Sequence, residues 1–137
     1  MSNPRILVTC PPMLGLIEEF ENDFRSHGLD YVAAETSQVL SEDELIEILP
    51  DFDGWIIGDD PASKKVVEAA TAGKLRAAVK WGVGVDNVDF NAFEESGIPV
   101  ENTPGVFGGE VADVALTYAL GLARATYQID RAIRNEN

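Results

Sequence analysis

The sequence predicts a doubly wound α/β fold, in which a parallel sheet carries helices on both of its faces. Two observations predict this fold class. Short apolar runs alternate along the chain with segments whose apolar residues recur at helical spacing, which is the rhythm of βαβ units. The apolar runs also lack the polar–apolar alternation of half-exposed strands, so we expect strands that are buried on both sides and joined by right-handed connections.

The first strand and the first helix precede Gly28. Residues 5–10 form an apolar run that predicts a strand, and Pro11 and Pro12 end it. A helix is expected next, up to a stop at Gly28, because four apolar side chains recur at helical spacing: Leu14, Ile17, Phe20 and Phe24. Residues 31–34 then predict the second strand.

The remaining elements of the sheet continue the same rhythm. Ser41 and Glu44 form a capping box, which starts a helix that ends at Pro50. The further elements are a strand over 55–57, a helix over 63–70, a strand over 77–81 and a strand at 99–100. Five strands in this arrangement predict a flavodoxin-like sheet of order 2-1-3-4-5.

The long helix expected over residues 109–123 differs from the others because it is apolar nearly all round. A helix of this kind is buried against more than one partner, and a small sheet covers only one side. We therefore expect a domain over 1–104, followed over 105–137 by an interdomain helix that leads to a domain absent from this sequence. An apolar helix left in water also predicts that the chain self-associates into a homo-oligomer.

The composition narrows the range of partners and compartments. Ten Lys and Arg stand against 24 Asp and Glu, a net charge of −14, so nucleic acid and anionic membranes would be repelled. Cys10 is the single cysteine, which excludes an internal disulfide. No apolar run reaches membrane-spanning length and no signal peptide precedes the first strand, so we expect a cytoplasmic protein.

A glycine-containing segment over residues 80–89 (KWGVGVDNVD) gives the first indication of function. We expect it to lead from the end of the fourth strand into a short helix, and ligands of open parallel sheets bind beyond the carboxyl ends of strands. Successive backbone N–H groups near Val83 and Gly84 could hold a carboxylate there. A Gly-x-Gly is a weak signal by itself, and on the bare pattern a tight turn that needs glycine is the better interpretation.

Two further motifs follow the glycine segment. They are residues 97–105 (GIPVENTPG) and residues 110–113 (EVAD), the second of which opens the long helix that ends in Leu122-Ala123-Arg124. Together the three motifs resemble the D-isomer-specific 2-hydroxyacid dehydrogenases, in particular the phosphoglycerate dehydrogenase-like group. The resemblance covers essentially the whole chain, and three linked motifs in order are far more specific than any one of them.

The resemblance implies roles for individual residues. The backbone N–H groups of Val83 and Gly84 match those that hold the substrate carboxylate, and Val83 also matches a residue beside the nicotinamide. Val111 matches a position that touches the cofactor where two domains meet. Lys80 matches a basic residue that faces the substrate in some relatives, and a solvated lysine at a strand end is the equally favoured alternative.

Departures from the family pattern bear on the substrate. Relatives that act on phosphoglycerate often carry an arginine after the third strand, whereas this chain has Gly58-Asp59-Asp60, whose two carboxylates would repel a phosphate. Phe107 replaces a small polar residue that faces the substrate in many relatives, which favours a more apolar pocket. Asp86 and Asn87 are expected to cap the short helix rather than to take part in chemistry.

Several groups that the family's hydride transfer needs are absent from the sequence. The resemblance assigns a substrate-orienting arginine, a histidine with its carboxylate partner, and the glycine-rich fingerprint for NAD or NADP to the nucleotide-binding half. No Gly-x-Gly-x-x-Gly is present here. The one histidine, His27, stands at a helix end, where an interaction with the helix dipole is expected, and no Cys/His spacing indicates a metal.

The motifs therefore predict the substrate-binding domain of an NAD(P)-dependent oxidoreductase that acts on a small D-2-hydroxy or 2-oxo acid. Its partner would be the nucleotide-binding domain of the same enzyme, and the chain by itself would be inactive and bind no cofactor. The alternative is a stand-alone, non-catalytic flavodoxin-like module that binds a small acid or a protein. A phosphoacceptor receiver domain is disfavoured, because Cys10-Pro11-Pro12 takes the place of its acidic pair.

Overall fold

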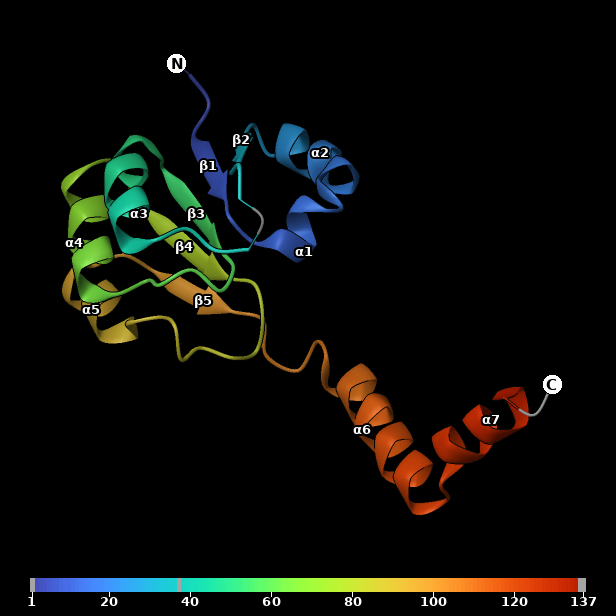
Figure 1. Ribbon diagram of the computed structural model, residues 1–137. Coiled ribbons are helices and arrows are strands. Elements are labelled where there is room, and N and C mark those ends of the chain that lie inside the picture. The colour runs from blue at the N-terminus through green and yellow to red at the C-terminus, as the bar shows by residue number, and fades with distance from the viewer. Residues whose placement is uncertain (1, 37, 136–137) are drawn as a thin grey trace. The chain divides into compact units, whose positions relative to one another are not determined.

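The computed structural model describes residues 2–36 and 38–135, and the chain divides into two compact units (Figure 1). The first, Met1–Thr103, is called the sheet unit, and the second, Pro104–Asn137, is called the helical unit. The roles predicted for the two parts, a substrate-binding domain and an interdomain helix, remain predictions.

The sheet unit contains five parallel strands in the order β2-β1-β3-β4-β5, which confirms the predicted fold class. The strands are β1 (Arg5–Val8), β2 (Asp30–Ala33), β3 (Gly54–Ile57), β4 (Ala77–Lys80) and β5 (Val100–Asn102). The register places Leu7 between Val32 of β2 and Trp55 of β3. The first strand of the chain thus lies inside the sheet, and β2 and β5 form its edges.

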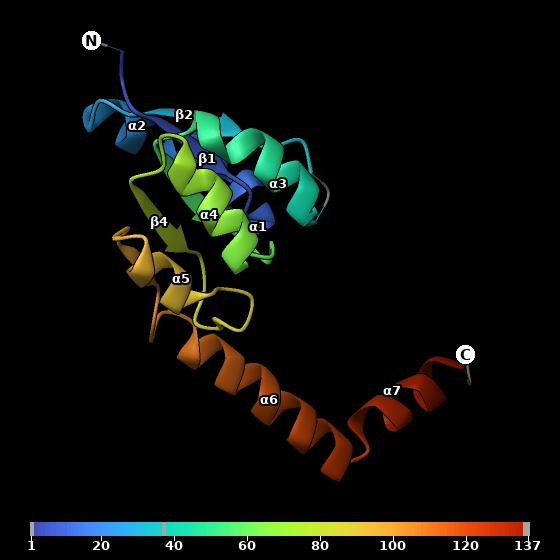
Figure 2. The same cartoon turned by 90° about the vertical axis from the view of Figure 1, so that its left-hand side faces the viewer.

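Helices cover both faces of this sheet (Figure 1 and Figure 2). One face carries α1 (Pro11–Leu14) and α2 (Ile17–Ser26); the other carries α3 (Glu42–Ile48), the short 3-10 helix η1 (Leu49–Asp51), α4 (Lys64–Ala72) and α5 (Phe90–Glu95). Two separate cores result, one on each face. Phe93 and Trp55 are buried in the larger core, and Met13 and Phe24 are buried in the smaller one.

The region that follows β1 differs from the prediction. The strand ends at Val8 rather than at residue 10, and the expected single helix is two helices, which part at Gly15 and Leu16. Pro11 and Pro12 end the strand, but they also begin α1. A proline suits the first turn of a helix because its fixed φ fits there and its missing N–H has no helical partner to lose.

The capping box at the start of α3 is confirmed. The Ser41 N–H donates to Glu44 Oε2 at 2.8 Å, and the Glu44 N–H donates to Ser41 Oγ at 3.4 Å. Hydrogen bonds from the Ser41 side chain and then from its backbone hold the pKa of Glu44 below its ordinary value. The box is therefore strongest when the Glu44 carboxylate is ionised.

The helical unit consists of α6 (Gly108–Ala123) and α7 (Thr126–Asn135). Ala125 turns the chain between them with a φ of 51°, and Gly121 admits the Tyr127 ring so closely that a Cβ would lie 2.5 Å from it. The large apolar side chains of α6 are exposed: Val111, Val114, Leu116, Tyr118, Leu120 and Leu122. None of the helices in the described residues is long and apolar enough to cross a membrane.

Candidate functional site

The glycine loop, residues 81–88, follows β4 at the carboxyl edge of the sheet and leads towards α5. This is the edge at which open parallel sheets bind ligands. Among residues 2–36 and 38–135, no acceptor receives a hydrogen bond from the backbone N–H of Val83 or Gly84, and both residues are exposed. The two N–H groups predicted to hold a carboxylate are therefore accessible to an acceptor on a ligand.

Gly82 is the residue of this loop whose backbone conformation requires glycine. Its φ of 141° lies in the region that residues with a side chain rarely adopt. Gly84 has no positive φ, and a Cβ there would meet Asp86 Oδ1 at 3.6 Å, which is an ordinary contact. The tight-turn interpretation thus explains the first glycine of Gly-x-Gly, and it leaves the second without a conformational reason.

Hydrogen bonds from the end of β5 hold the loop. The Thr103 N–H donates to Gly82 O at 3.0 Å, and the Gly82 N–H donates to Thr103 Oγ1 at 2.9 Å. Asn102 Nδ2 donates to Val83 O at 3.2 Å. The sequence places Asn102 and Thr103 within a family motif, but only the parallel pairing of β4 with β5 brings them beside the glycine loop.

Lys80 is buried, so the expectation of a solvated surface lysine is wrong. Its side chain is 5% exposed, and its Nζ donates to Gly58 O and, at 3.0 Å, to Asp59 Oδ1. A buried ammonium needs such partners because an unpaired charge in the interior is costly. Lys80 thereby ties the turn after β3 to the end of β4. Its predicted contact with the substrate remains a prediction.

Asp60 is the centre of a buried polar network that the sequence did not reveal. Its carboxylate accepts hydrogen bonds from Thr9 Oγ1, from the Leu40 N–H at 2.9 Å and from the Gly58 N–H at 3.1 Å. Asp60 is fully buried, whereas the side chain of Asp59 is 83% exposed and pairs with Lys80. That the two carboxylates of this turn repel a phosphate stays a prediction.

Asn87 braces the glycine loop against the turn after β3. Its Nδ2 donates to Asp60 O at 2.7 Å and to Gly58 O at 3.1 Å. The expected capping role of Asp86 and Asn87 is wrong, because α5 begins later and is capped by the side chain of Asp89. A sequence pattern cannot separate these acidic and amide residues, since each is a good cap and they lie within three positions of one another.

Two further side chains of reactive type, His27 and Cys10, are not part of the glycine loop. His27 ends α2, and its Nδ1 lies 2.8 Å from Asp23 O, which agrees with the expected interaction at a helix end. Cys10 is buried, and burial raises the pKa of its thiol. In the described part of the chain, no three His, Cys, Asp or Glu side chains gather in a way that could hold a metal ion.

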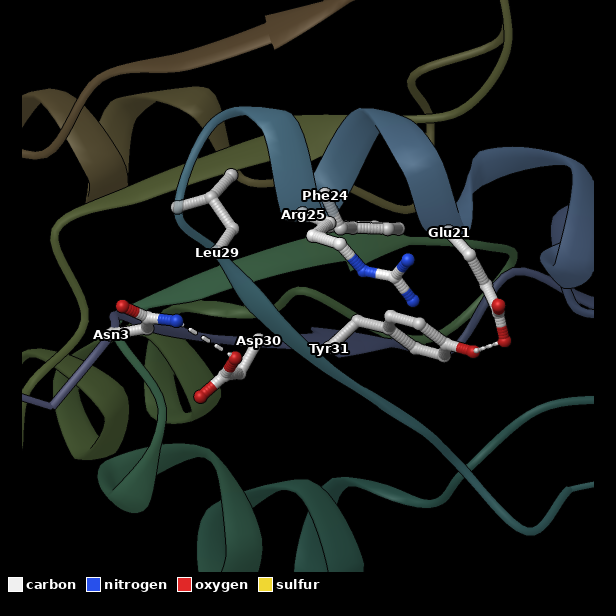
Figure 3. A pocket seen from close by; sticks show the side chains of 7 residues that line it. All are labelled: Asn3, Glu21, Phe24, Arg25, Leu29, Asp30 and Tyr31. Carbon is white, nitrogen blue, oxygen red and sulfur yellow. Dashed lines mark hydrogen bonds between the residues drawn. The ribbon is translucent and has the colours of Figure 1, made fainter.

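A separate pocket lies at the edge strand β2 (Figure 3). Its lining side chains are Asn3, Glu21, Phe24, Arg25, Leu29, Asp30 and Tyr31. The Tyr31 hydroxyl donates to Glu21 Oε1 at 3.1 Å, which raises the pKa of Tyr31, and Asn3 Nδ2 donates to Asp30 Oδ1 at 3.0 Å. Asn3 and Asp30 mark the beginnings of β1 and β2, so this pocket lies towards the amino edge of the sheet. We assign it no part in ligand binding at the carboxyl edge.

An apolar groove runs along α6 in the helical unit. It is lined by Phe107, Glu110, Val111, Val114, Ala115 and Tyr118. Val111, the predicted cofactor contact, is 63% exposed, and Phe107 stands exposed at the start of the helix. The groove offers apolar surface to a partner, and the roles predicted for these two residues remain predictions.

Comparisons with known proteins agree over nearly the whole chain. Residues 6–135 match the family described as D-isomer specific 2-hydroxyacid dehydrogenase, catalytic domain. A hydroxypyruvate reductase of Thermotoga maritima is 38% identical over 90 residues, which are 65% of this chain and 29% of the relative. A D-3-phosphoglycerate dehydrogenase of Archaeoglobus fulgidus is 31% identical over 131 residues, which are 95% of this chain and 23% of the relative. The chain thus spans less than a third of the length of these two relatives.

Solved structures share the fold. The NAD+-bound 3-phosphoglycerate dehydrogenase of Entamoeba histolytica matches with a TM-score of 0.75 and 25% identity, over 87% of this chain and 39% of that protein. The holo form of D-mandelate dehydrogenase from Rhodotorula graminis matches with a TM-score of 0.74 and 22% identity, over 100% of this chain and 41% of that protein. The second likeness concerns the fold alone.

Proposed function

This chain belongs to the D-isomer specific 2-hydroxyacid dehydrogenase family, and on that premise we propose that it binds the carboxylate of a small D-2-hydroxy or 2-oxo acid for an NAD(P)-dependent oxidoreductase. The family's members are oxidoreductases. The observation that carries the proposal is the pair of exposed N–H groups of Val83 and Gly84, which find no acceptor within the described residues and lie at the carboxyl edge of the sheet.

Backbone N–H groups suit a carboxylate for a physical reason. Hydrogen bonds to a charged acceptor contribute about 1.5–3 kcal/mol each, and two adjacent donors can meet the two oxygens of one carboxylate. Gly84 adds no side chain beside its N–H group, so the substrate can approach this donor closely. Lys80 stands nearby, at the end of the preceding strand, but its ammonium already pairs with Asp59 at 3.0 Å, so the two N–H groups carry the proposal.

The charges around the loop favour an unphosphorylated acid. A pocket beside the glycine loop is lined by Asp59, Asp86 and Asp89. Asp59 pairs with Lys80, and the other two carboxylates would repel a phosphate. The basic residue in the same pocket, Lys64, already pairs with Glu95 at 2.8 Å. The names of relatives leave room for both classes, since hydroxypyruvate and glyoxylate reductases occur beside phosphoglycerate dehydrogenases. We assign this chain to the former class of substrate.

We propose that this chain touches NAD or NADP at the nicotinamide end and does not bind the whole dinucleotide. Val83 and Val111 are the residues proposed to touch the nicotinamide end, where the cofactor would accept or supply the hydride. The residues present do not fit a whole dinucleotide, because the sequence contains no Gly-x-Gly-x-x-Gly to hold the pyrophosphate at a helix N-terminus. We therefore place the dinucleotide, and the residues that move the proton, on a nucleotide-binding domain of the whole protein. The exposed apolar side of α6 would contact that domain and a second copy of the chain.

Titration with a small carboxylate tests the binding site directly. We expect the amide resonances of Val83 and Gly84 in the ¹⁵N-labelled chain to shift with millimolar glycolate and not with ethylene glycol, which lacks the carboxylate. Gly84→Val should remove the response and leave the fold intact, because position 84 has no positive φ and an added Cβ makes only ordinary contacts. Gly15→Val is the matched control, since its Cβ would also find ordinary contacts, at 3.6 Å from Pro11 O. Shifts confined to other residues would contradict the proposal.

A second prediction follows from placing the dinucleotide and the proton-transfer residues on another domain. The purified 137-residue chain should catalyse no reduction of glyoxylate or hydroxypyruvate by NADH or NADPH above the rate without protein. The reason is that it contains neither the dinucleotide fingerprint nor an acid/base histidine near the glycine loop, because His27 lies at the end of α2. The loss of absorbance at 340 nm measures this, and turnover that rises in proportion to chain concentration would contradict it.

A further inference from the structure

We propose that Asn102 and Thr103 are positioning residues, which aim the N–H groups of Val83 and Gly84 at the substrate carboxylate. The inference rests on the proposed carboxylate site and adds the reason for its geometry. Neither side chain need touch the substrate. The Asn102 side chain binds the Val83 carbonyl, and the Thr103 side chain accepts the Gly82 N–H while the Thr103 backbone N–H binds the Gly82 carbonyl.

The first peptide group joins Gly82 to Val83. In a trans peptide the carbonyl of one residue and the N–H of the next point in opposite directions, and no peptide bond of the described chain is cis. The Gly82 carbonyl is turned towards β5, because it accepts the Thr103 N–H at 3.0 Å. The Val83 N–H must therefore point away from Thr103. The return bond, from the Gly82 N–H to Thr103 Oγ1, locks the same residue from its other side.

The second peptide group joins Val83 to Gly84 and obeys the same rule. The Val83 carbonyl accepts Asn102 Nδ2 at 3.2 Å, so the Gly84 N–H points away from Asn102. In an extended strand successive carbonyls alternate in direction, and their N–H groups diverge. Here two successive carbonyls are held by neighbouring residues of one strand end. The two N–H groups therefore leave on the same side, which is the arrangement that binds an anion.

The φ of Gly82 explains how the chain enters this arrangement. Its value of 141° lies outside the region of an extended strand, and only glycine adopts it without strain. Thr103 then fixes this conformation with two hydrogen bonds, one from its backbone and one to its side chain. Asn102 and Thr103 together convert a flexible glycine segment into a site whose donors are oriented before the ligand arrives, which lowers the entropic cost of binding.

Side-chain variants separate positioning from binding. Thr103→Val keeps the shape and removes Oγ1, Thr103→Ser restores the hydroxyl, and Asn102→Leu removes the Nδ2 donor. The matched control is Asn91→Leu, at an exposed position on α5. Each is made in the full 137-residue chain, and thermal unfolding confirms that it folds. Two readouts follow: the ¹⁵N order parameters of Val83 and Gly84 without ligand, and the dissociation constant for glycolate from amide shifts.

We expect Thr103→Val and Asn102→Leu to lower the order parameters of both amides and to weaken glycolate binding about tenfold, the scale of one charge-assisted hydrogen bond. Thr103→Ser and Asn91→Leu should resemble the wild type in both readouts. Unchanged order parameters in folded Thr103→Val and Asn102→Leu would overturn the inference, whatever the binding. If the order parameters fall but glycolate shifts neither amide even in the wild type, the carboxylate site fails while the orientation of the loop by β5 stands.

Discussion

The sheet unit buries its large apolar side chains, whereas the helical unit exposes them to solvent. In the sheet unit the largest side chains are internal, and Trp55, Phe93 and Leu45 are at most 1% exposed. In α6 the only buried residue is Gly121, while Leu122, Tyr118 and Val111 are each more than 60% exposed. The first unit has a core of its own, whereas the second exposes its large apolar side chains, as interaction surfaces do.

This difference shows where the chain's stability lies and where its interactions lie. Full burial of a large apolar side chain stabilises a fold by roughly 1.5–3 kcal/mol relative to leaving it exposed. The exposed side chains of α6 do not contribute this stabilisation to the helical unit. Substitutions in the sheet unit should therefore change folding, and substitutions on α6 should change association.

Core truncation should separate the two units most clearly. Phe93→Ala should lower the free energy of unfolding of the sheet unit by about 3–5 kcal/mol, because it opens a cavity in a fully buried position. Leu122→Ala removes an exposed side chain and should change it by less than about 0.5 kcal/mol. Urea titration followed by tryptophan fluorescence measures this, since both tryptophans, Trp55 and Trp81, lie in the sheet unit. Equal losses in both variants would mean that the units unfold as one.

Self-association should distinguish the surfaces of the two units. We expect the chain to form oligomers at micromolar concentration, and Leu116→Glu to weaken the association at least about tenfold, because it places a charge within the apolar side of α6. Leu16→Glu is the matched control, since Leu16 is an exposed leucine of the sheet unit. Sedimentation velocity over a range of concentrations reports the effect. A wild-type chain that stays monomeric throughout would show that α6 needs no partner.

Helix ends give the smallest and most local contrast. The α3 capping box should respond to pH, whereas α6 starts at Phe107 without a side-chain cap. Ser41→Ala should cost about 1 kcal/mol of stability at pH 7. Because the pKa of Glu44 is lowered in the folded state, its contribution is full above its unfolded pKa and is lost as pH falls through the folded pKa. The stability difference between wild type and Glu44→Gln, measured by urea unfolding, should therefore vanish in acid. A difference that persists in acid would exclude the ionised carboxylate as its source.

Local patterns in the sequence were sufficient for the sheet and for the place of the glycine loop at its edge. The rhythm of apolar runs predicted five parallel strands, and the spacing of Ser41 and Glu44 predicted a cap that the structure confirms. The glycine segment indicated the right edge of the sheet, because strand ends are visible in a sequence. The split between α1 and α2 escaped prediction, since Pro11 and Pro12 both end a strand and begin a helix.

The rest of the site depends on contacts between distant residues. Asp60 looked like a surface charge beside Asp59, and its inward turn depends on Thr9 and Leu40, which reach it only in the folded sheet. Lys80 looked equally like a surface lysine, and its burial depends on the Gly58 carbonyl of a neighbouring strand's turn. Secondary-structure propensity and residue spacing describe the local preference of a residue. They do not identify a hydrogen-bond partner that lies 20 or more positions away in the sequence.

The large sequence separation of these hydrogen-bonded residues also determines the order in which parts of the chain fold during synthesis. Asp60 meets Thr9 across 51 positions, and Gly82 meets Thr103 across 21. Contacts of such separation form late, because the chain must first lose the entropy of closing the intervening loops. On the ribosome the glycine loop is made well before residues 102 and 103 emerge, so the two N–H groups stay unaligned until the last edge strand has docked. Small carboxylates should therefore recognise only the finished sheet, and their binding draws partly folded chains towards it.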